Sequence, residues 1–285
     1  MEIKKIGVMG CGLMGCGIAE VSAKAGYDVL VSEINQNLLD KGMQAIDESL
    51  ARAVKAGKMT DADKATVLQR IKGTIKIADF GDRDLMIEAA VENLELKKKI
   101  FTELDTIVPK DSILATNTSC LSVIAIASAT KRQDKVVGMH FFNPVPVMKL
   151  LELVRTVATS EETLAEAKKV GEKLGKSIIV APDVPGFIVN RLLMPHLIEA
   201  FKSYESGLAS REDIDKGVQL GLGYPMGPLA LADYVGLDTI VMIGDAMFEE
   251  TKDSHMAIPV ILRKMVAAGW YGRKSGKGFY DYTKK

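Results

Sequence analysis

The sequence is poor in cysteine, in net charge and in long apolar runs, and each shortage excludes a class of protein. Three cysteines among 285 residues are too few for a disulfide framework, so we expect reduced thiols and a cytoplasmic location. Lys and Arg number 37 and so do Asp and Glu, which argues against nucleic acid or an anionic membrane as the main partner. No apolar run approaches the roughly 18 residues of a membrane span, and we expect no leader before the first strand.

The most readable local pattern is a strand, a glycine turn and a helix near the start of the chain. The apolar run 6–9 enters GCGLMGCG at 10–17, and a helix follows to about Ala25. The first glycine permits a tight turn, the second lets the backbone approach a pyrophosphate, and the third lets helix and strand pack closely. The pattern predicts a dinucleotide site formed by Gly10, Gly12, Leu13, Met14 and Gly15.

An acidic residue at the end of the second predicted strand supports this site. Residues 28–32 form that strand, and Glu33 follows it about 20 residues after the glycines. An acid at this position binds the adenosine ribose hydroxyls of NAD. Glu33 would repel a 2′-phosphate and no arginine lies beside it, so NAD is favoured over NADP.

About 40 residues separate this strand from the next one, which we expect at 74–77, and this is more than one crossover helix needs. The spacing predicts an inserted pair of helices, one over 38–54 and another from near Thr60, with Asp63 in capping-box position. Basic residues gather around the turn between the helices. These residues are Arg52, Lys55 and Lys58. They form either a binding site for a phosphorylated ligand tail or a solvated helical face.

Two further predicted strands, 85–89 and 113–116, should end on the same rim of the sheet as the glycine loop. Glu92 and Lys97 follow the first strand and could border the nicotinamide side of the cofactor. No metal-ligand set is predicted here or elsewhere in the chain.

The second of these strands leads into NTSCLS at 117–122. Asn117 and Ser119 are candidates to contact the cofactor or a substrate oxygen, although Ser119 could instead only cap the following helix. Cys120 opens a nucleophilic alternative, in which a thiol attacks an acyl group, but no activating base is visible beside it.

A histidine and a carboxylate lie in adjacent strand-like runs. Residues 136–139 form a buried strand with His140 at its end, and the apolar run 150–154 is interrupted only by Glu152. A lone carboxylate in a buried strand needs a partner, and His140 is the obvious one. A histidine oriented by a carboxylate is typical of a general base near neutral pH. The alternative is a core histidine with a strand-edge glutamate.

A helix over 161–174 and a strand over 177–180 complete an alternating α/β domain. Two prolines and a glycine follow in 181–191, and the pattern beyond is helical, so we expect domains at 1–183 and 184–285. Asn190 lies early in the first helix of the second domain among apolar residues. A buried amide must be satisfied, so Asn190 either holds the domain junction or faces the cleft.

Taken together, these segments resemble the 3-hydroxyacyl-CoA dehydrogenase family, most closely the short bacterial 3-hydroxybutyryl-CoA dehydrogenases. The resemblance covers nearly the whole chain. The matching segments are GCGLMGCGIA, EAAVENLELKK, TNTS, GMHFFNPVPVMKLLELV, PGFIVNR, YPMGPLALADYVGLD and GRKSGKGFYDY.

The resemblance implies a Rossmann-like NAD-binding domain with a helical-hairpin insertion, followed by an all-α domain that forms a homodimer. The implied reaction interconverts an (S)-3-hydroxyacyl-CoA, with 3-hydroxybutyryl-CoA expected, and a 3-oxoacyl-CoA such as acetoacetyl-CoA. The family's roles assign catalysis to His140 and Glu152, substrate hydrogen bonds to Ser119 and Asn190, and the nicotinamide surroundings to Glu92, Lys97 and Asn143. The hairpin is implied to help hold CoA.

Two positions depart from the family pattern. A second serine often stands where this chain has Cys120, and an aspartate where it has Glu33. Two alternatives are an abundant structural protein that binds NAD, as in lens crystallins of this family, and a dehydrogenase of free 3-hydroxy acids. The retained His140, Glu152, Ser119 and Asn190 argue against the first alternative, and His140 and Glu152 argue against the second.

Overall fold

The computed structural model describes residues 2–283. The chain divides into two compact units, Met1–Val184 and Pro185–Lys285, whereas the boundary predicted from the sequence lies after residue 183. In the described part of the chain, no helix combines the length and the apolar composition needed to cross a membrane.

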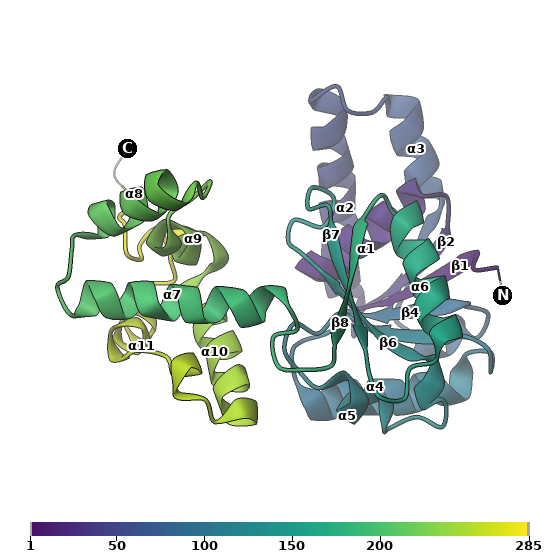
Figure 1. Ribbon diagram of the computed structural model, residues 1–285. Helices are drawn as coiled ribbons and strands as arrows, with labels where there is room; N and C mark the ends of the chain where they lie inside the picture. The colour runs from purple at the N-terminus through teal and green to yellow at the C-terminus, as the bar shows by residue number, and fades with distance from the viewer. Residues whose placement is uncertain (1, 284–285) are drawn as a thin grey trace. The chain divides into compact units, whose positions relative to one another are not determined.

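The first unit is built on one eight-stranded sheet with the order β3-β2-β1-β4-β5-β6-β7-β8 (Figure 1). Neighbouring strands are parallel except for β6 and β7, which are antiparallel. The first six positions have the order of a dinucleotide-binding sheet. The strands are β1 Lys5–Met9, β2 Asp28–Ser32, β3 Ile71–Thr74, β4 Leu85–Glu88, β5 Ile113–Thr116, β6 Val136–Phe141, β7 Leu150–Arg155 and β8 Ser177–Pro182.

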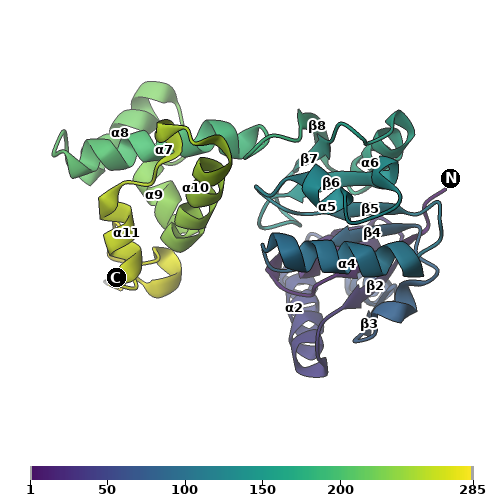
Figure 2. The same cartoon turned by 90° about the horizontal axis from the view of Figure 1, so that it is seen from below.

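Helices cover both faces of this sheet, which explains why the central strands are almost continuously apolar (Figures 1 and 2). Apolar residues of α1, α2 and α6 share one core with the sheet, while α4 and α5 bury side chains such as Phe101 and Val123 on the opposite face. The helices are α1 Leu13–Lys24, α2 Gln36–Lys55, α3 Asp61–Gln69, α4 Leu94–Ile107, α5 Val123–Ala127 and α6 Glu161–Lys173.

The inserted helical pair is confirmed. Helices α2 and α3 lie side by side (Figure 1), and the Thr60 hydroxyl accepts from Asp63 N while the Asp63 side chain accepts from Thr60 N. This capping box satisfies two backbone donors that would otherwise lack partners. It fixes the start of α3 after the turn that carries Lys58, whereas Arg52 and Lys55 lie in the last turn of α2.

Two predicted strand positions were wrong. The strand expected at 74–77 is β3 at Ile71–Thr74, and residues 77–80 form a short 3-10 helix. Pairing with β2 decides the register because it buries Ile71, and Gly73 leaves room for Leu39 of α2. Strand β6 also continues to Phe141, so His140 lies within the strand and not at its end.

The second unit is helical, as predicted, around its own apolar core. The carboxylate of Asp233 accepts hydrogen bonds from the backbone of Phe279 and Tyr280, which ties the C-terminal segment to this core. Its helices are α7 Val189–Glu205, α8 Arg211–Leu222, α9 Pro228–Val235, α10 Leu237–Thr251 and α11 Val260–Ala267. The predicted fold class, an α/β domain followed by an all-α domain, is confirmed.

Candidate active site

The glycine turn after β1 leaves backbone exposed for a ligand. Gly10 has a φ of +97°, and a Cβ there would lie 2.8 Å from the Ala89 carbonyl oxygen. A Cβ on Gly15 would overlap the Gly10 carbonyl, so this position requires glycine for close packing. A Cβ on Gly12 would meet nothing within 4 Å, and α1 begins there without a side-chain cap. The exposed N–H groups at this helix start suit an anion.

Glu33 lies beside this turn. Its Oε1 accepts a hydrogen bond of 2.8 Å from Cys11 N, and its Oε2 accepts one of 3.1 Å from Ile34 N. Strands β1 and β2 are parallel neighbours, so their carboxyl ends bring the acid and the glycines together. The acid is thus fixed at the same rim as the anion-binding backbone.

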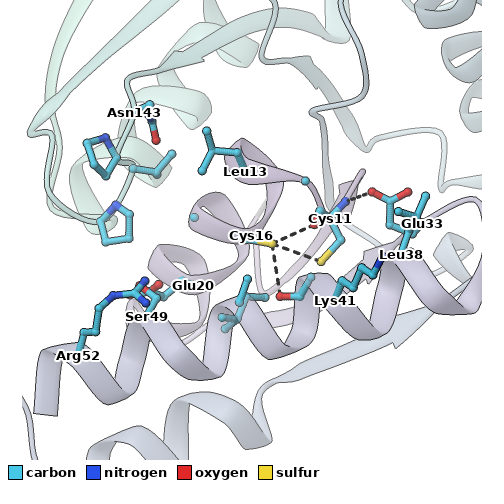
Figure 3. A pocket seen from close by; sticks show the side chains of 18 residues that line it. Cys11, Leu13, Cys16, Glu20, Glu33, Leu38, Lys41, Ser49, Arg52 and Asn143 are labelled. Carbon is cyan, nitrogen blue, oxygen red and sulfur yellow. Dashed lines mark hydrogen bonds between the residues drawn. The ribbon is translucent and has the colours of Figure 1, made fainter. Parts of the chain in front are cut away.

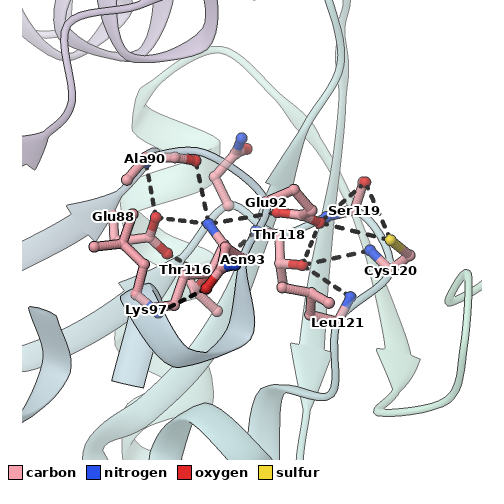
Figure 4. A network of polar contacts seen from close by, with 12 residues as sticks. Glu88, Ala90, Glu92, Asn93, Lys97, Thr116, Thr118, Ser119, Cys120 and Leu121 are labelled. Atoms are coloured by element: carbon pink, nitrogen blue, oxygen red, sulfur yellow. Dashed lines mark hydrogen bonds and ion pairs between the residues drawn. The ribbon is translucent and has the colours of Figure 1, made fainter. Parts of the chain in front are cut away.

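A buried ion network lies where β4 and β5 end on this rim (Figure 4). Lys97 Nζ lies 2.6 Å from Glu88 Oε1 and 3.4 Å from Glu92 Oε2. Lys97 and Glu88 are almost completely buried, and the Thr116 hydroxyl donates to the other Glu88 oxygen. The attraction within this buried pair offsets part of the cost of removing both groups from water.

Glu92 connects the network to Ser119. Its Oε1 accepts from Thr118 Oγ1 at 2.6 Å, from Ser119 N at 2.8 Å and from Ser119 Oγ at 3.2 Å. Burial raises the pKa of Glu92, but attraction to Lys97 and these hydrogen bonds outweigh burial and hold the pKa below its ordinary value. Glu92 is therefore an ionised acceptor that positions the Ser119 hydroxyl.

Two alternatives for the segment after β5 are not supported by its geometry. The cap of α5 is Ser122, whose hydroxyl accepts from Ala125 N, so Ser119 does not cap this helix. Burial and the neighbouring Glu92 carboxylate raise the pKa of the Cys120 thiol to about 12. A thiol held in its protonated form is a poor nucleophile.

His140 and Glu152 are directly opposite each other on the antiparallel strands β6 and β7. Opposite residues project from the same face, and here His140 Nδ1 lies 2.6 Å from Glu152 Oε2. Glu152 is fully buried and His140 is 6% exposed. The Phe142 ring packs against the imidazole with the ring centroids 4.5 Å apart. The predicted contact thus forms by cross-strand pairing, which the sequence reasoning did not specify.

The remaining predicted residues have different surroundings. Asn117 Oδ1 accepts from Phe141 N, which links the end of β5 to β6 next to His140. Asn143 borders a cavity of about 350 Å³ between α1, α2 and the loop after β6 (Figure 3). Asn190 is the second residue of α7 in the other unit and is 8% exposed.

The basic cluster is divided by the structure. Arg52 borders the cavity beside Asn143 and also a larger one, of about 800 Å³, along α2 and α3. Lys58 borders the larger cavity as well, whereas the lining of neither includes Lys55. Of the predicted cluster, Arg52 and Lys58 therefore border the larger cavity, whose lining also includes the cations Lys24 and Arg70.

Sequence reasoning missed Glu88 and Lys176. Glu88 is a carboxylate in a buried strand, the same signal that drew attention to Glu152. Lys176 is mostly buried, and its Nζ donates to the carbonyls of Val145 and Met148, which holds the loop that follows Asn143. Nothing local in the sequence around Lys176 predicts this long-range contact.

Comparisons with known proteins match both units. The family model for the NAD-binding domain of 3-hydroxyacyl-CoA dehydrogenase matches residues 5–184. The family model for the C-terminal domain of the same enzyme matches residues 186–282. A 3-hydroxybutyryl-CoA dehydrogenase of Mycobacterium tuberculosis is 48% identical over 282 residues, which cover 98% of this chain and 99% of the relative. One of Clostridioides difficile is 44% identical over 280 residues, with 98% and 100% covered.

Solved structures agree with this likeness. The crystal structure of (S)-3-hydroxybutyryl-CoA dehydrogenase from Ralstonia eutropha has a TM-score of 0.95 and 45% identity, and the match covers 99% of this chain and all of that one. A structure from M. tuberculosis has a TM-score of 0.97 at 48% identity, with 99% and 100% covered.

Proposed function

The chain belongs to the 3-hydroxyacyl-CoA dehydrogenase family, and from this premise we propose that it interconverts (S)-3-hydroxybutyryl-CoA and acetoacetyl-CoA with NAD. The similar proteins from M. tuberculosis and R. eutropha are both named 3-hydroxybutyryl-CoA dehydrogenase. The observation that carries the proposal is the buried contact between His140 and Glu152, because it joins a proton acceptor to a carboxylate within the nucleotide-binding unit.

The residues at the glycine turn fit NAD. The open space at Gly12 and the uncapped start of α1 suit the pyrophosphate, and Glu33 suits the adenosine ribose. When bound, NAD supplies the hydride chemistry at C3 of the substrate. Four residues are proposed to surround its nicotinamide end: Asn117, Asn143, Glu92 and Lys97. Lys97 contributes by holding the carboxylates of Glu88 and Glu92 in place.

His140 moves the proton in this proposal. In oxidation it takes the proton of the 3-hydroxyl, and in reduction it returns that proton to the carbonyl oxygen. In this proposal Nδ1–H donates a hydrogen bond to Glu152, so the opposite ring nitrogen, Nε2, is the atom that exchanges a proton with substrate. The buried Glu152 carboxylate also lies where it would stabilise positive charge that develops on the ring during turnover.

Two further side chains are proposed to hydrogen-bond the substrate. Ser119 is held by Glu92, so its hydroxyl is oriented before the substrate arrives. Asn190 is assigned the same task on the family resemblance. Arg52 and Lys58 are proposed to meet the CoA phosphates along the hairpin.

The test is oxidation of NADH by acetoacetyl-CoA, followed by absorbance, with NADH binding measured in parallel by fluorescence. We expect turnover within the ordinary enzyme range of roughly 1 to 10³ per second. Binding of NADH without turnover would instead support a structural NAD-binding protein. Turnover of free acetoacetate in preference to its CoA thioester would make the chain a dehydrogenase of free acids.

A further inference from the structure

Two cysteines flank the first turn of α1. Gly12 is the N-cap of this helix, so Cys11 precedes the cap and Cys16 is the fourth helical residue. Side chains at these two positions pack together at helix starts because the chain enters the helix at a fixed angle. Here the two sulfur atoms lie 3.7 Å apart, and Cys16 Sγ also lies 2.9 Å from the Cys11 carbonyl oxygen (Figure 3).

Helix α2 encloses the pair. A Cβ on Gly42 would lie 2.3 Å from Cys11 Sγ, so only glycine allows α2 to approach this closely. The Gly42 carbonyl oxygen lies 3.4 Å from Cys16 Sγ on the same side. The two sulfur atoms therefore lie next to each other where α2 approaches α1.

The pair differs in access to solvent. Cys11 is 3% exposed and Cys16 is half-buried, and both border the cavity of about 350 Å³ between α1 and α2. The hydrogen bond with Cys11 lowers the pKa of the Cys16 thiol, and the same bond together with burial raises that of Cys11. A small reagent entering the cavity therefore meets Cys16 first, and Cys16 is the thiol of the pair with the lowered pKa.

We propose that Cys11 and Cys16 are an oxidation site, at which a low-molecular-weight disulfide forms a Cys11–Cys16 disulfide that weakens NAD binding. The effect on NAD rests on the proposed function, whereas the formation of the bond rests on the sulfur geometry alone. In this proposal the reduced glycine turn binds NAD, and the oxidised turn binds it more weakly.

The chemistry balances with oxidised glutathione as the oxidant. The Cys16 thiolate attacks one glutathione sulfur, which forms a mixed disulfide and expels one glutathione thiolate. Cys11 then loses its proton, attacks Cys16 Sγ and expels the second glutathione. The protein gives up two protons and two electrons, and one oxidised glutathione becomes two reduced molecules.

The bond would disturb the backbone that holds NAD. A disulfide has an S–S length of about 2.05 Å, so the sulfur atoms must approach by about 1.7 Å from their separation of 3.7 Å. Cys11 N donates to Glu33, and Cys11 lies between Gly10 and Gly12, so its displacement moves both the ribose acid and the anion site. Shifts of this size in a positioning element commonly reduce function by large factors.

The experiment treats the whole protein with oxidised glutathione and then measures its mass, its disulfide map and its NADH affinity before and after dithiothreitol. We expect a mass lower by two hydrogen atoms, a peptide linking Cys11 to Cys16, and an affinity for NADH at least about tenfold weaker that dithiothreitol restores. Each variant is compared with itself in the reduced state. Cys120→Ser should keep the full response, and Cys16→Ser should lose it.

Each contrary result has a separate meaning. Retention of all three thiols, or a stable mixed disulfide with glutathione at Cys16, would overturn the proposal. A mapped Cys11–Cys16 disulfide with unchanged NADH affinity would overturn its effect on cofactor binding. A reduced protein that binds no NADH would contradict the proposed function, while the mass and the disulfide map would still decide whether the bond forms.

Discussion

At the scale of single residues, the pair of His140 and Glu152 is proposed to act as one unit in proton transfer. The carboxylate is fully buried and lies 2.6 Å from Nδ1, so removing either side chain leaves the other without its partner for proton transfer. Groups that act together in this way give losses that do not multiply.

We therefore expect His140→Gln to lower kcat by roughly 10²-fold or more, the usual size of a general acid–base contribution. Binding of NADH, measured by fluorescence, should stay close to wild type because the glycine turn is unchanged. Glu152→Gln should also be severely impaired, and the double variant should be scarcely slower than His140→Gln alone. Normal turnover in His140→Gln would reject this histidine as the base, and multiplying losses would give Glu152 a separate role.

Glu33 sets the second prediction at this scale. Its carboxylate is held against Cys11 N at the proposed ribose end of the site, where a 2′-phosphate would bring a second negative charge close to it. We expect kcat/KM with NADH to exceed that with NADPH by roughly tenfold or more, since repulsion of about 1.4 kcal/mol suffices for this ratio. Glu33→Gln keeps an oxygen acceptor for Cys11 N but removes the negative charge. It should therefore lower the ratio of kcat/KM with NADH to kcat/KM with NADPH. Equal or better activity with NADPH in the wild type would contradict the charge argument.

At the scale of elements, the basic residues of the α2–α3 hairpin differ in whether they border the larger cavity. Arg52 and Lys58 border the larger cavity, and Lys55 provides a matched cation outside its lining. The double variant Arg52→Gln with Lys58→Gln should raise KM for acetoacetyl-CoA roughly three- to tenfold, because exposed ion pairs contribute up to about 1 kcal/mol each.

Two controls accompany this prediction. Lys55→Gln should leave KM for acetoacetyl-CoA nearly unchanged, and a truncated thioester without the nucleotide should show no difference among the variants. Equal changes in KM for both substrates would show that the cluster is only a solvated face.

Elements with strong local signals could be predicted from the sequence, and those decided by pairing could not. The glycine turn and the capping box of Thr60 and Asp63 follow from nearby residues alone. Strand β3 was misplaced because several isoleucines compete for burial and only pairing with β2 selects Ile71. The antiparallel pairing of β6 with β7 is likewise tertiary, although it creates the contact of His140 with Glu152.

The candidate site shows the same limit. Polar residues at strand ends could be identified singly, because parallel strands end on one rim. Their mutual bonds depend on distant partners, as when Lys97 binds Glu88 and Glu92 orients Ser119. The sequence therefore indicates candidate residues one at a time, although it missed Glu88, and the fold supplies the contacts among them.

At the scale of the whole molecule, the second unit leaves large apolar side chains in solvent. Four leucines are at least 64% exposed: Leu192 of α7, Leu208 of the segment between α7 and α8, and Leu220 and Leu222 of α8. Exposed apolar surface of this kind often marks a protein interface, since burying it against a partner is favourable. With the family resemblance, this supports a homodimer formed through the helical unit.

We expect the protein to sediment as a dimer at micromolar concentration in analytical ultracentrifugation. The double variant Leu220→Lys with Leu222→Lys should shift it toward monomer, because a dimer would have to bury the added charges without partners. Val157→Lys is the matched control, since Val157 belongs to the first unit and is 98% exposed, so the same substitution there should leave the dimer intact. A wild-type protein that sediments as a monomer, or a double variant that remains dimeric, would exclude this end of α8 from a dimer interface.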